Sequence, residues 1–169
     1  MIVRRHERDG RVSVVRHSDC ERYRYDLTRT WEPRGPKVLF IMLNPSTATE
    51  RANDSTVARV EQRAQAMGFG AYRVCNLFAW RATRPELLLA ADAPVGPEND
   101  EVLIEACQWA DQLICAWGNH GGFDGRGAAV EALMRRTARP LFHFGLTQQG
   151  HPKHPLYLPY STLPVEWRA

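Results

Sequence analysis

No stretch of this sequence has the roughly 18 consecutive apolar residues that a membrane-spanning helix requires. The first residues are charged from Arg4 onward and include no apolar segment of the secretory kind, so we expect no signal peptide and a cytoplasmic protein. Hydrophobic residues make up 44% and charged residues 24% of the 169 positions. This composition favours one globular domain over residues 1–169, long enough to bury a core.

Lysine is nearly absent, because Lys37 and Lys153 stand beside twenty arginines among the 22 basic residues. The planar guanidinium of arginine suits phosphates and nucleobases better than the ammonium of lysine does. A codon bias explains the same excess without any function. The formal net charge of +3 is too small to establish nucleic-acid binding.

Cysteine is scarce, and none of the four cysteines forms a C-x-x-C pair. Cys75, Cys107 and Cys115 lie inside apolar segments, which indicates buried thiols rather than metal ligands. The sequence also lacks G-x-x-x-x-G-K-[ST], G-x-G-x-x-G and G-x-S-x-G, so the common nucleotide-binding loops and the serine hydrolase elbow find no support. We expect neither a metal nor a cofactor.

The N-terminal part, residues 1–36, is predicted to hold a strand pair over 11–31 that decorates the main domain. Valines mark its first strand, and Tyr23, Tyr25 and Leu27 alternate with polar neighbours in the second. The stretch EPRGPK at 32–37 breaks the chain before a core over 37–160.

The core alternates apolar strands with helices. Strands are predicted at 38–43, 72–78, 113–117 and 141–144, and helices at about 55–67, 97–110 and 127–137, with Asp54 as N-cap of the first. Such alternation implies right-handed crossovers and parallel strands covered on both faces. We therefore predict an α/β fold: a three-layer αβα sandwich with a four-stranded, mainly parallel central sheet and an N-terminal β-ribbon.

Three loops with polar chemistry follow the predicted strands, where open parallel sheets bind their ligands. The candidate site residues are Asn44, Pro45 and Ser46 in the first loop; Asn76, Phe78, Trp80, Arg81 and Thr83 in the second; and His151 and His154 in the third. Asparagine offers both a donor and an acceptor, Phe78 or Trp80 is available for stacking on a base, and the histidines can donate to a developing anion.

Each loop also has a structural explanation. Asn44 before a proline suits an Asx-type turn, and a backbone partner in the fold would satisfy the buried amide of Asn76. Zinc binding by His151 and His154 lacks a nearby cysteine or acidic ligand. A fourth segment, Gly118-Asn119-His120, precedes a helix, where a glycine loop either binds phosphate or serves as a flexible connection.

The segments LNPSTA, NLFAWRAT, PVGPEND, AWGNHG and HPKHPLY, in that order over roughly residues 20–160, resemble those of a bacterial family of unknown function (DUF1643-like). That resemblance carries no activity with it.

A more distant resemblance is to the uracil-DNA glycosylase superfamily, especially its mismatch-specific branch. It implies a uracil-DNA glycosylase-like fold in which Asn44, in an N-P loop, positions the attacking water. NLFAWRAT is similar to the branch's N-(M/L)-x-x-R-x-T stretch, with Asn76, Arg81 and Thr83 at the matching positions, and His154-Pro155 is similar to the H-P-S loop of the superfamily.

Three functional hypotheses follow. In the first, the protein binds a nucleobase, nucleotide or DNA as an N-glycosidase: Asn44 places water, Asn76 reads the base edge and His154 stabilises the departing base. In the second, the same site binds a nucleotide or modified base without chemistry, which the absence of a carboxylate from the first loop favours. In the third, a small-molecule hydrolase or transferase uses the glycine loop and His120.

Overall fold

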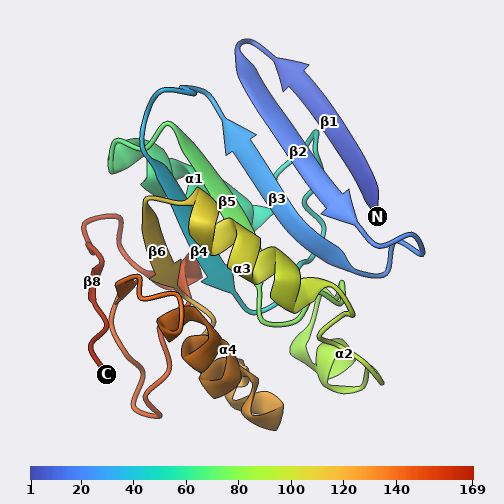
Figure 1. Cartoon of the computed structure of the whole chain (residues 1–169), viewed down its shortest axis with the longest axis vertical. Helices are drawn as coiled ribbons and strands as arrows, with labels where there is room; N and C mark the ends of the chain where they lie inside the picture. The colour runs from blue at the N-terminus through green and yellow to red at the C-terminus, as the bar shows by residue number, and fades with distance from the viewer.

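The computed structural model describes residues 1–169 and has one sheet of eight strands in the order β1-β2-β3-β5-β4-β6-β7-β8 (Figure 1). The strands are β1 Ile2–Arg8, β2 Arg11–His17, β3 Arg24–Thr30, β4 Lys37–Met42, β5 Ala71–Asn76, β6 Gln112–Cys115, β7 Leu141–His143 and β8 Val165–Glu166. The α-helices are α1 Ser55–Ala66, α2 Pro85–Leu89, α3 Asn99–Trp109 and α4 Arg126–Arg135, and two 3-10 helices are η1 Asn119–Gly125 and η2 Pro155–Tyr157.

The prediction of a four-stranded, mainly parallel sheet in a three-layer sandwich with a separate ribbon is wrong. Strands β5, β4, β6 and β7 do run parallel to one another, but four of the seven strand pairings in the sheet are antiparallel. The main reason is β3, which pairs with β5 and so joins the N-terminal strands to the sheet instead of leaving them as an ornament.

The predicted strand pair over 11–31 is confirmed as β2 and β3, but both outer strands of the sheet escaped prediction. Strand β1, IVRRHER, is an edge strand with mostly polar residues. It therefore lacks the alternation of apolar and polar residues by which strands are recognised in a sequence. Strand β8 has two residues in a proline-punctuated tail and pairs with β7.

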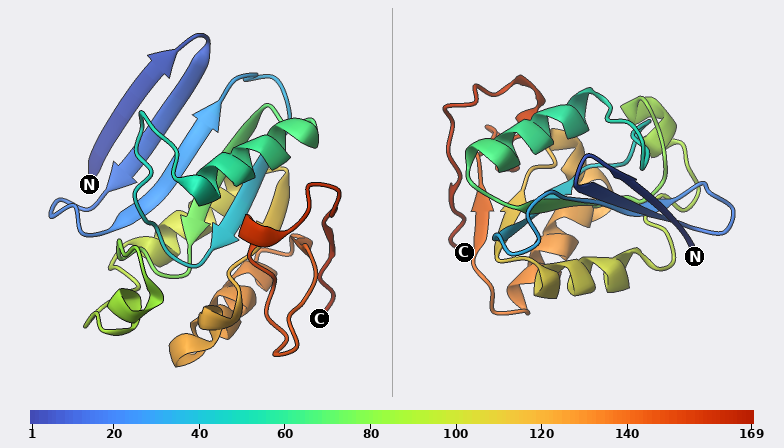
Figure 2. Two further views of the ribbon diagram at one scale, coloured as in Figure 1. Left: turned by 180° about the vertical axis from the view of Figure 1, so that it is seen from behind. Right: turned by 90° about the horizontal axis from the view of Figure 1, so that it is seen from above.

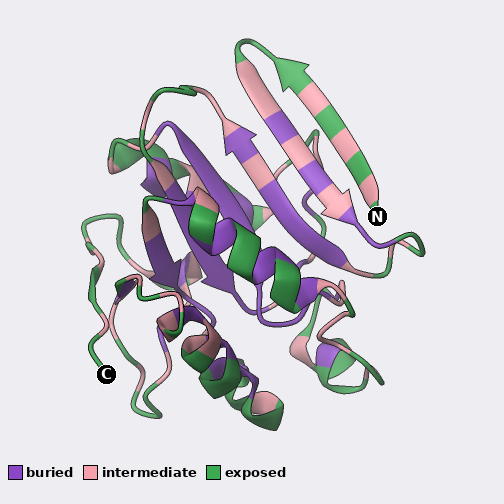
Figure 3. Ribbon diagram, in the orientation of Figure 1, coloured by how far each residue is buried: buried purple, intermediate pink, exposed green.

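Helices cover both faces of the sheet, with α1 on one side and α3 and α4 on the other (Figure 2, right). The central strand β4 is buried from Val38 to Met42, as its continuous apolar run predicts (Figure 3). Val38, Phe40 and Met42 belong to the apolar cluster under α1, whereas Leu39 and Ile41 belong to the cluster under α3 and α4. Alternate side chains of β4 thus belong to two apolar cores, one on each face of the sheet.

A buried ion-pair network ties the N-terminal strands to the rest of the sheet. Asp26 of β3 is 2% exposed and accepts hydrogen bonds from Arg16 Nε on β2 at 3.0 Å and from Arg73 Nε on β5 at 2.9 Å. Glu105 of α3 contacts both arginines from the solvent side, each at 3.3 Å. The guanidinium of Arg73 also lies over the Trp109 ring.

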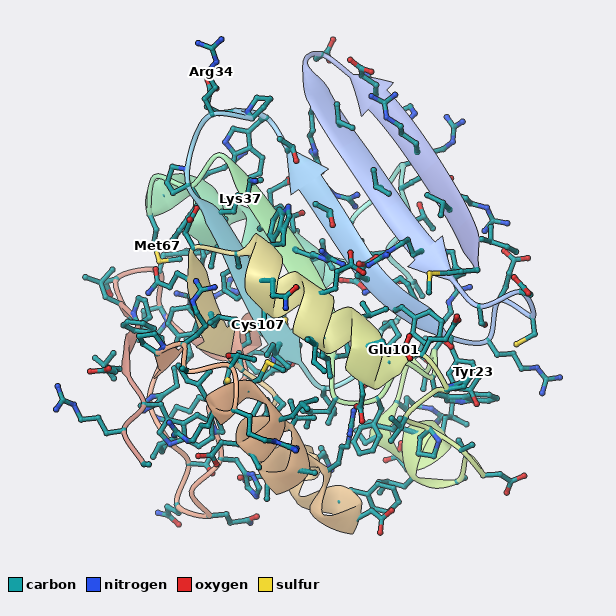
Figure 4. All side chains as sticks on the ribbon, viewed as in Figure 1. Tyr23, Arg34, Lys37, Met67, Glu101 and Cys107 are labelled. Carbon is teal, nitrogen blue, oxygen red and sulfur yellow. The ribbon has the colours of Figure 1, made fainter.

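Cys75, Cys107 and Cys115 are buried as predicted, and Cys20 is exposed. Cys107 lies on α3 (Figure 4), and its Sγ is 3.2 Å from Thr137 Oγ1. Burial raises the pKa of the Cys75 thiol to about 12, so this thiol is protonated at neutral pH. None of the helices is long and apolar enough to cross a membrane.

Candidate functional site

A cavity of about 610 Å³ lies where β4 and β5 end, on the face of the sheet that carries α1. The loops that follow both strands, the first turn of α1 and the segment around η2 enclose it. Because β4 and β5 are parallel, their carboxyl ends meet at one edge, which brings these loops together. The lining residues are Arg24, Met42, Leu43, Asn44, Ser46, Thr47, Asp54, Ser55, Thr56, Val57, Val74, Asn76, Ala82, Thr83, Pro85, His154, Leu156 and Tyr157.

The C-terminal segment reaches the cavity because α1 holds it there. Arg59 Nη2 and Arg63 Nη2 each donate to the carbonyl of Leu158 at 2.8 Å. Seen from behind, α1 lies in front of the sheet and η2 lies next to it (Figure 2, left). The two arginines therefore fix a loop from the end of the chain beside loops from its middle.

Asn44 is held in one orientation by its own loop and by the next. Its Nδ2 donates to Pro45 O at 3.0 Å and to Ala82 O at 2.9 Å. Neither bond is the Asx-type turn that we considered, in which Oδ1 would accept from a backbone N–H. Because both donor hydrogens of the amide are engaged, Oδ1 is the atom of Asn44 that remains available to accept a hydrogen bond from a ligand or a water molecule.

Asn76, the last residue of β5, is 1% exposed, and its Nδ2 has no hydrogen-bond partner. The backbone partner that would explain this amide structurally is missing. Asn99 Nδ2 instead donates to the carbonyls of Asn76 and Leu77, and Arg126 Nε donates to Leu77 O. An unpaired buried amide is costly, and a water molecule or a ligand group in the cavity would satisfy it.

His154 is neutral and has a defined tautomer. Its Nδ1 accepts from the backbone N–H of Leu156 at 3.3 Å, which leaves the proton on Nε2. Burial lowers the pKa of His154 to about 4, and the nearby Asp54 offsets this in small part. At neutral pH the imidazole is therefore a hydrogen-bond donor to the cavity without a charge.

Arg24, the first residue of β3, is a cavity residue that sequence reasoning missed. Asp26 pairs with Arg16 and Arg24 pairs with His17, so Tyr25 is an extra residue in the ladder. Such a bulge turns the side chains on its two sides to opposite faces. Asp26 accordingly contacts Arg73 on the α3 face, whereas Arg24 donates from Nη1 to Ala48 O at 3.0 Å beside α1.

Asp54 is the one carboxylate in the cavity wall, and its predicted role as a helix cap is confirmed. Its Oδ1 accepts from Val57 N at 2.8 Å and its Oδ2 from Ala48 N at 3.2 Å. Helix α1 ends within a residue of the predicted position. With both oxygens engaged by backbone N–H groups, Asp54 is poorly placed to act as a general base.

Several predicted site residues lie elsewhere. Phe78 is 1% exposed and packs against Phe123 in the core, and Trp80 packs edge-on against Tyr23. Arg81 donates to the carbonyl of Glu21 at 3.3 Å. The aromatic side chain that lines the cavity is Tyr157, which is 90% exposed at its rim.

The glycine loop forms a separate region with His151. Gly118 N donates to Pro152 O at 2.8 Å, and a Cβ on Gly122 would lie 3.0 Å from His151 Nε2. Asn119 and His120 are exposed, and neither lines the cavity. A Cβ on Gly121 would collide with the Trp117 ring, so packing accounts for this glycine.

Comparison with known protein families identifies the family of the chain. The family model described as protein of unknown function (DUF1643) matches residues 24–156. The chain belongs to this family. The DUF1643 match begins at Arg24 and ends at Leu156, and it includes every cavity-lining residue except Tyr157. Strands β1, β2 and β8 lie outside it.

No curated protein and no solved structure matches this DUF1643 protein. The resemblance to the uracil-DNA glycosylase superfamily therefore gains no support from these comparisons, and the sheet described above departs from the fold that it implied.

Proposed function

We propose that this DUF1643 protein binds a nucleobase or nucleotide in the cavity at the ends of β4 and β5. The observation that carries the proposal is that Asn44, Asn76 with its unpaired amide and the neutral His154 all line one cavity. A base edge carries donors and acceptors side by side, and these three groups offer both kinds. The cavity volume of about 610 Å³ is within the usual range for small-molecule sites.

The proposal gives the Asn76 amide the partner that it lacks. Rotation about the last torsion of an asparagine side chain is soft, so a small turn brings either end of the amide to a base edge. Tyr157 at the rim can stack on the base, the role first expected of Phe78 or Trp80.

Replacing Asn76 by alanine tests the proposal with little structural disturbance. The side-chain Nδ2 makes no hydrogen bond in the free protein, so we expect the free energy of unfolding to change by less than about 1 kcal/mol. Nucleoside affinity, measured by calorimetry with adenosine, guanosine, cytidine and uridine, should fall about tenfold for the nucleoside that binds best.

Asn119→Ala is the matched control, because Asn119 is an exposed asparagine outside the cavity. It should leave nucleoside affinity unchanged. Wild-type protein that binds none of the four nucleosides or their 5′-monophosphates would refute the proposed function.

N-glycosidase activity is a second candidate, favoured by the fixed Oδ1 of Asn44 and the Nε2 proton of His154 on the same cavity. Asn44 Oδ1 would hold a water molecule by accepting a hydrogen bond from it. The water oxygen would bond to the anomeric carbon as the base–sugar bond breaks, and the bonding electrons would leave with the base. His154 would donate to that base, which finally takes the proton lost by water.

Asn44→Ala should lower the rate of base release about 100-fold, because the variant no longer positions the water. Release of free base is measured by chromatography with uracil-, hypoxanthine- and mismatch-containing DNA and with nucleosides. Nucleoside affinity should change less than the rate does. If wild-type protein binds nucleosides without turnover, the catalytic assignment falls and the binding function remains; if Asn44→Ala keeps full activity, the role of Asn44 is refuted.

A further inference from the structure

The guanidinium of Arg24 is buried in the cavity wall without an ionic partner. Arg24 is 2% exposed and lies within ion-pair distance of no carboxylate, although the charge of the nearby Asp54 favours its protonated form. A guanidinium has several N–H donors, but a single hydrogen bond to protein leaves it, from Nη1 to Ala48 O, and Nε is buried without a partner. Burial lowers the pKa of Arg24 to about 10, so the group still carries its charge at neutral pH.

Other buried arginines of the chain are far better satisfied. Arg73 pairs with Asp26, and Arg29 donates to Asn53 Oδ1 and to the carbonyls of Thr49 and Ala52. Arg63 donates to three backbone carbonyls of the C-terminal segment. A buried charge that lacks such partners is costly, so Arg24 differs from these structural arginines in a way that packing does not explain.

The start of α1 adds further donors to the same wall. Asp54 caps the N–H of Val57, whereas the N–H groups of Ser55 and Thr56 in the first turn have no intrahelical acceptor. The positive end of the helix dipole favours an anion at this position. Three residues that carry hydroxyl groups, Ser46, Thr47 and Thr83, line the same space.

We propose that Arg24 and the first turn of α1 form a phosphate subsite, so that the ligand of the cavity is a nucleotide rather than a free base or nucleoside. This inference rests on the proposed function for the identity of the base but not for the phosphate. A phosphate is favoured over a carboxylate because its oxygens spread over a tetrahedron and can accept from the guanidinium, the helix N–H groups and the hydroxyls together. The Asp54 carboxylate also lines the cavity, and its two backbone N–H donors and the helix terminus offset its charge.

The test compares wild type with Arg24→Met, which keeps the length of the side chain and removes its charge. Arg22→Met is the control, because Arg22 is an exposed arginine two residues away that does not line the cavity. Calorimetry at constant ionic strength uses three probes: inorganic phosphate, the four nucleosides and their 5′-monophosphates. The melting temperature of each variant is measured with and without phosphate.

For wild type and Arg22→Met, the monophosphate should bind at least about tenfold more tightly than its nucleoside, and phosphate should raise the melting temperature. Arg24→Met should abolish both effects while it keeps nucleoside affinity, and its own melting temperature should not fall, because it relieves a buried charge. Arg24→Lys, which retains a charge, should keep part of the preference for the monophosphate.

The outcomes separate the two proposals. Phosphate binding that depends on Arg24, with no added affinity from any base, would uphold the phosphate subsite and refute the nucleobase. Nucleoside binding that gains nothing from a phosphate, or monophosphate binding that is equal in wild type and Arg24→Met, would overturn the phosphate subsite and leave the nucleobase standing.

Discussion

Replacing Asp26 by alanine is expected to lower the free energy of unfolding by about 3–5 kcal/mol, which corresponds to a fall of about 10 °C in melting temperature. Asp26 is 2% exposed and accepts hydrogen bonds from Arg16 and Arg73. Its removal leaves Arg73, itself 5% exposed, with the partly exposed Glu105 as its remaining acidic neighbour. Urea denaturation at neutral pH, followed by circular dichroism, measures the effect.

Two variants show whether the loss comes from the buried charge. Glu105→Ala removes the carboxylate on the solvent side, whose side chain is 56% exposed, and should cost at most about 1 kcal/mol. Replacing both Asp26 by leucine and Arg73 by methionine removes the pair together and should recover part of the stability lost in Asp26→Ala. A loss below about 1 kcal/mol for Asp26→Ala would contradict the assigned role of this network.

Acid is expected to destabilise the protein through His154. Its pKa is lowered to about 4 in the fold by burial, against about 6.5 in the unfolded chain. The unfolded chain therefore takes up a proton first as pH falls, so the contribution of His154 is complete above about pH 6.5 and is lost as pH falls toward about 4. The loss amounts to about 2–3 kcal/mol between about pH 7.5 and about pH 4.5.

His154→Gln isolates this contribution from other groups that titrate in the same range. Burial also lowers the pKa values of His17 and His143, so both contribute acid sensitivity of the same sign. Urea titrations of wild type and His154→Gln at the two pH values should show a smaller loss in the variant, by about 2–3 kcal/mol. Equal losses in the two proteins would mean that His154 is not buried in its neutral form.

The sequence predicts those elements whose own residues carry the signal, as in the unbroken apolar run of a strand buried on both faces or in a helix with a cap and an apolar side. Strand β4 and helix α1 with its Asp54 cap lie within a residue or so of their predicted positions. The arrangement of the sheet was not predictable in the same way. A pattern of alternation identifies a strand but not its neighbour, so β3 was assigned to a ribbon although it pairs with β5.

The candidate site shows the same division between local and long-range information. Asn44, Asn76 and His154 follow or flank elements that converge at one edge, and the cavity does bring them together. Arg24 escaped detection because a single extra residue, Tyr25, reverses the face on which the side chain lies. The same bulge places Tyr25 and Leu27, which alternation assigned to one face, in the two opposite apolar clusters.

Part of the excess of arginine is explained by the structure of the chain itself. Several side chains donate to backbone carbonyls of segments that are distant in sequence, namely those of Arg29, Arg63 and Arg139. A forked donor can satisfy two such carbonyls at once, which an ammonium does with less geometric precision. Among the buried arginines, Arg24 is the exception, and it is the one that faces the cavity.

The most direct test of a nucleobase site at the ends of β4 and β5 is a crystal structure of the protein soaked with the 5′-monophosphate that binds best. The account predicts a base whose edge pairs with the Asn76 amide and a phosphate beside Arg24. A ligand seated instead at the glycine loop near His120 and His151, with the cavity holding nothing but solvent, would contradict it.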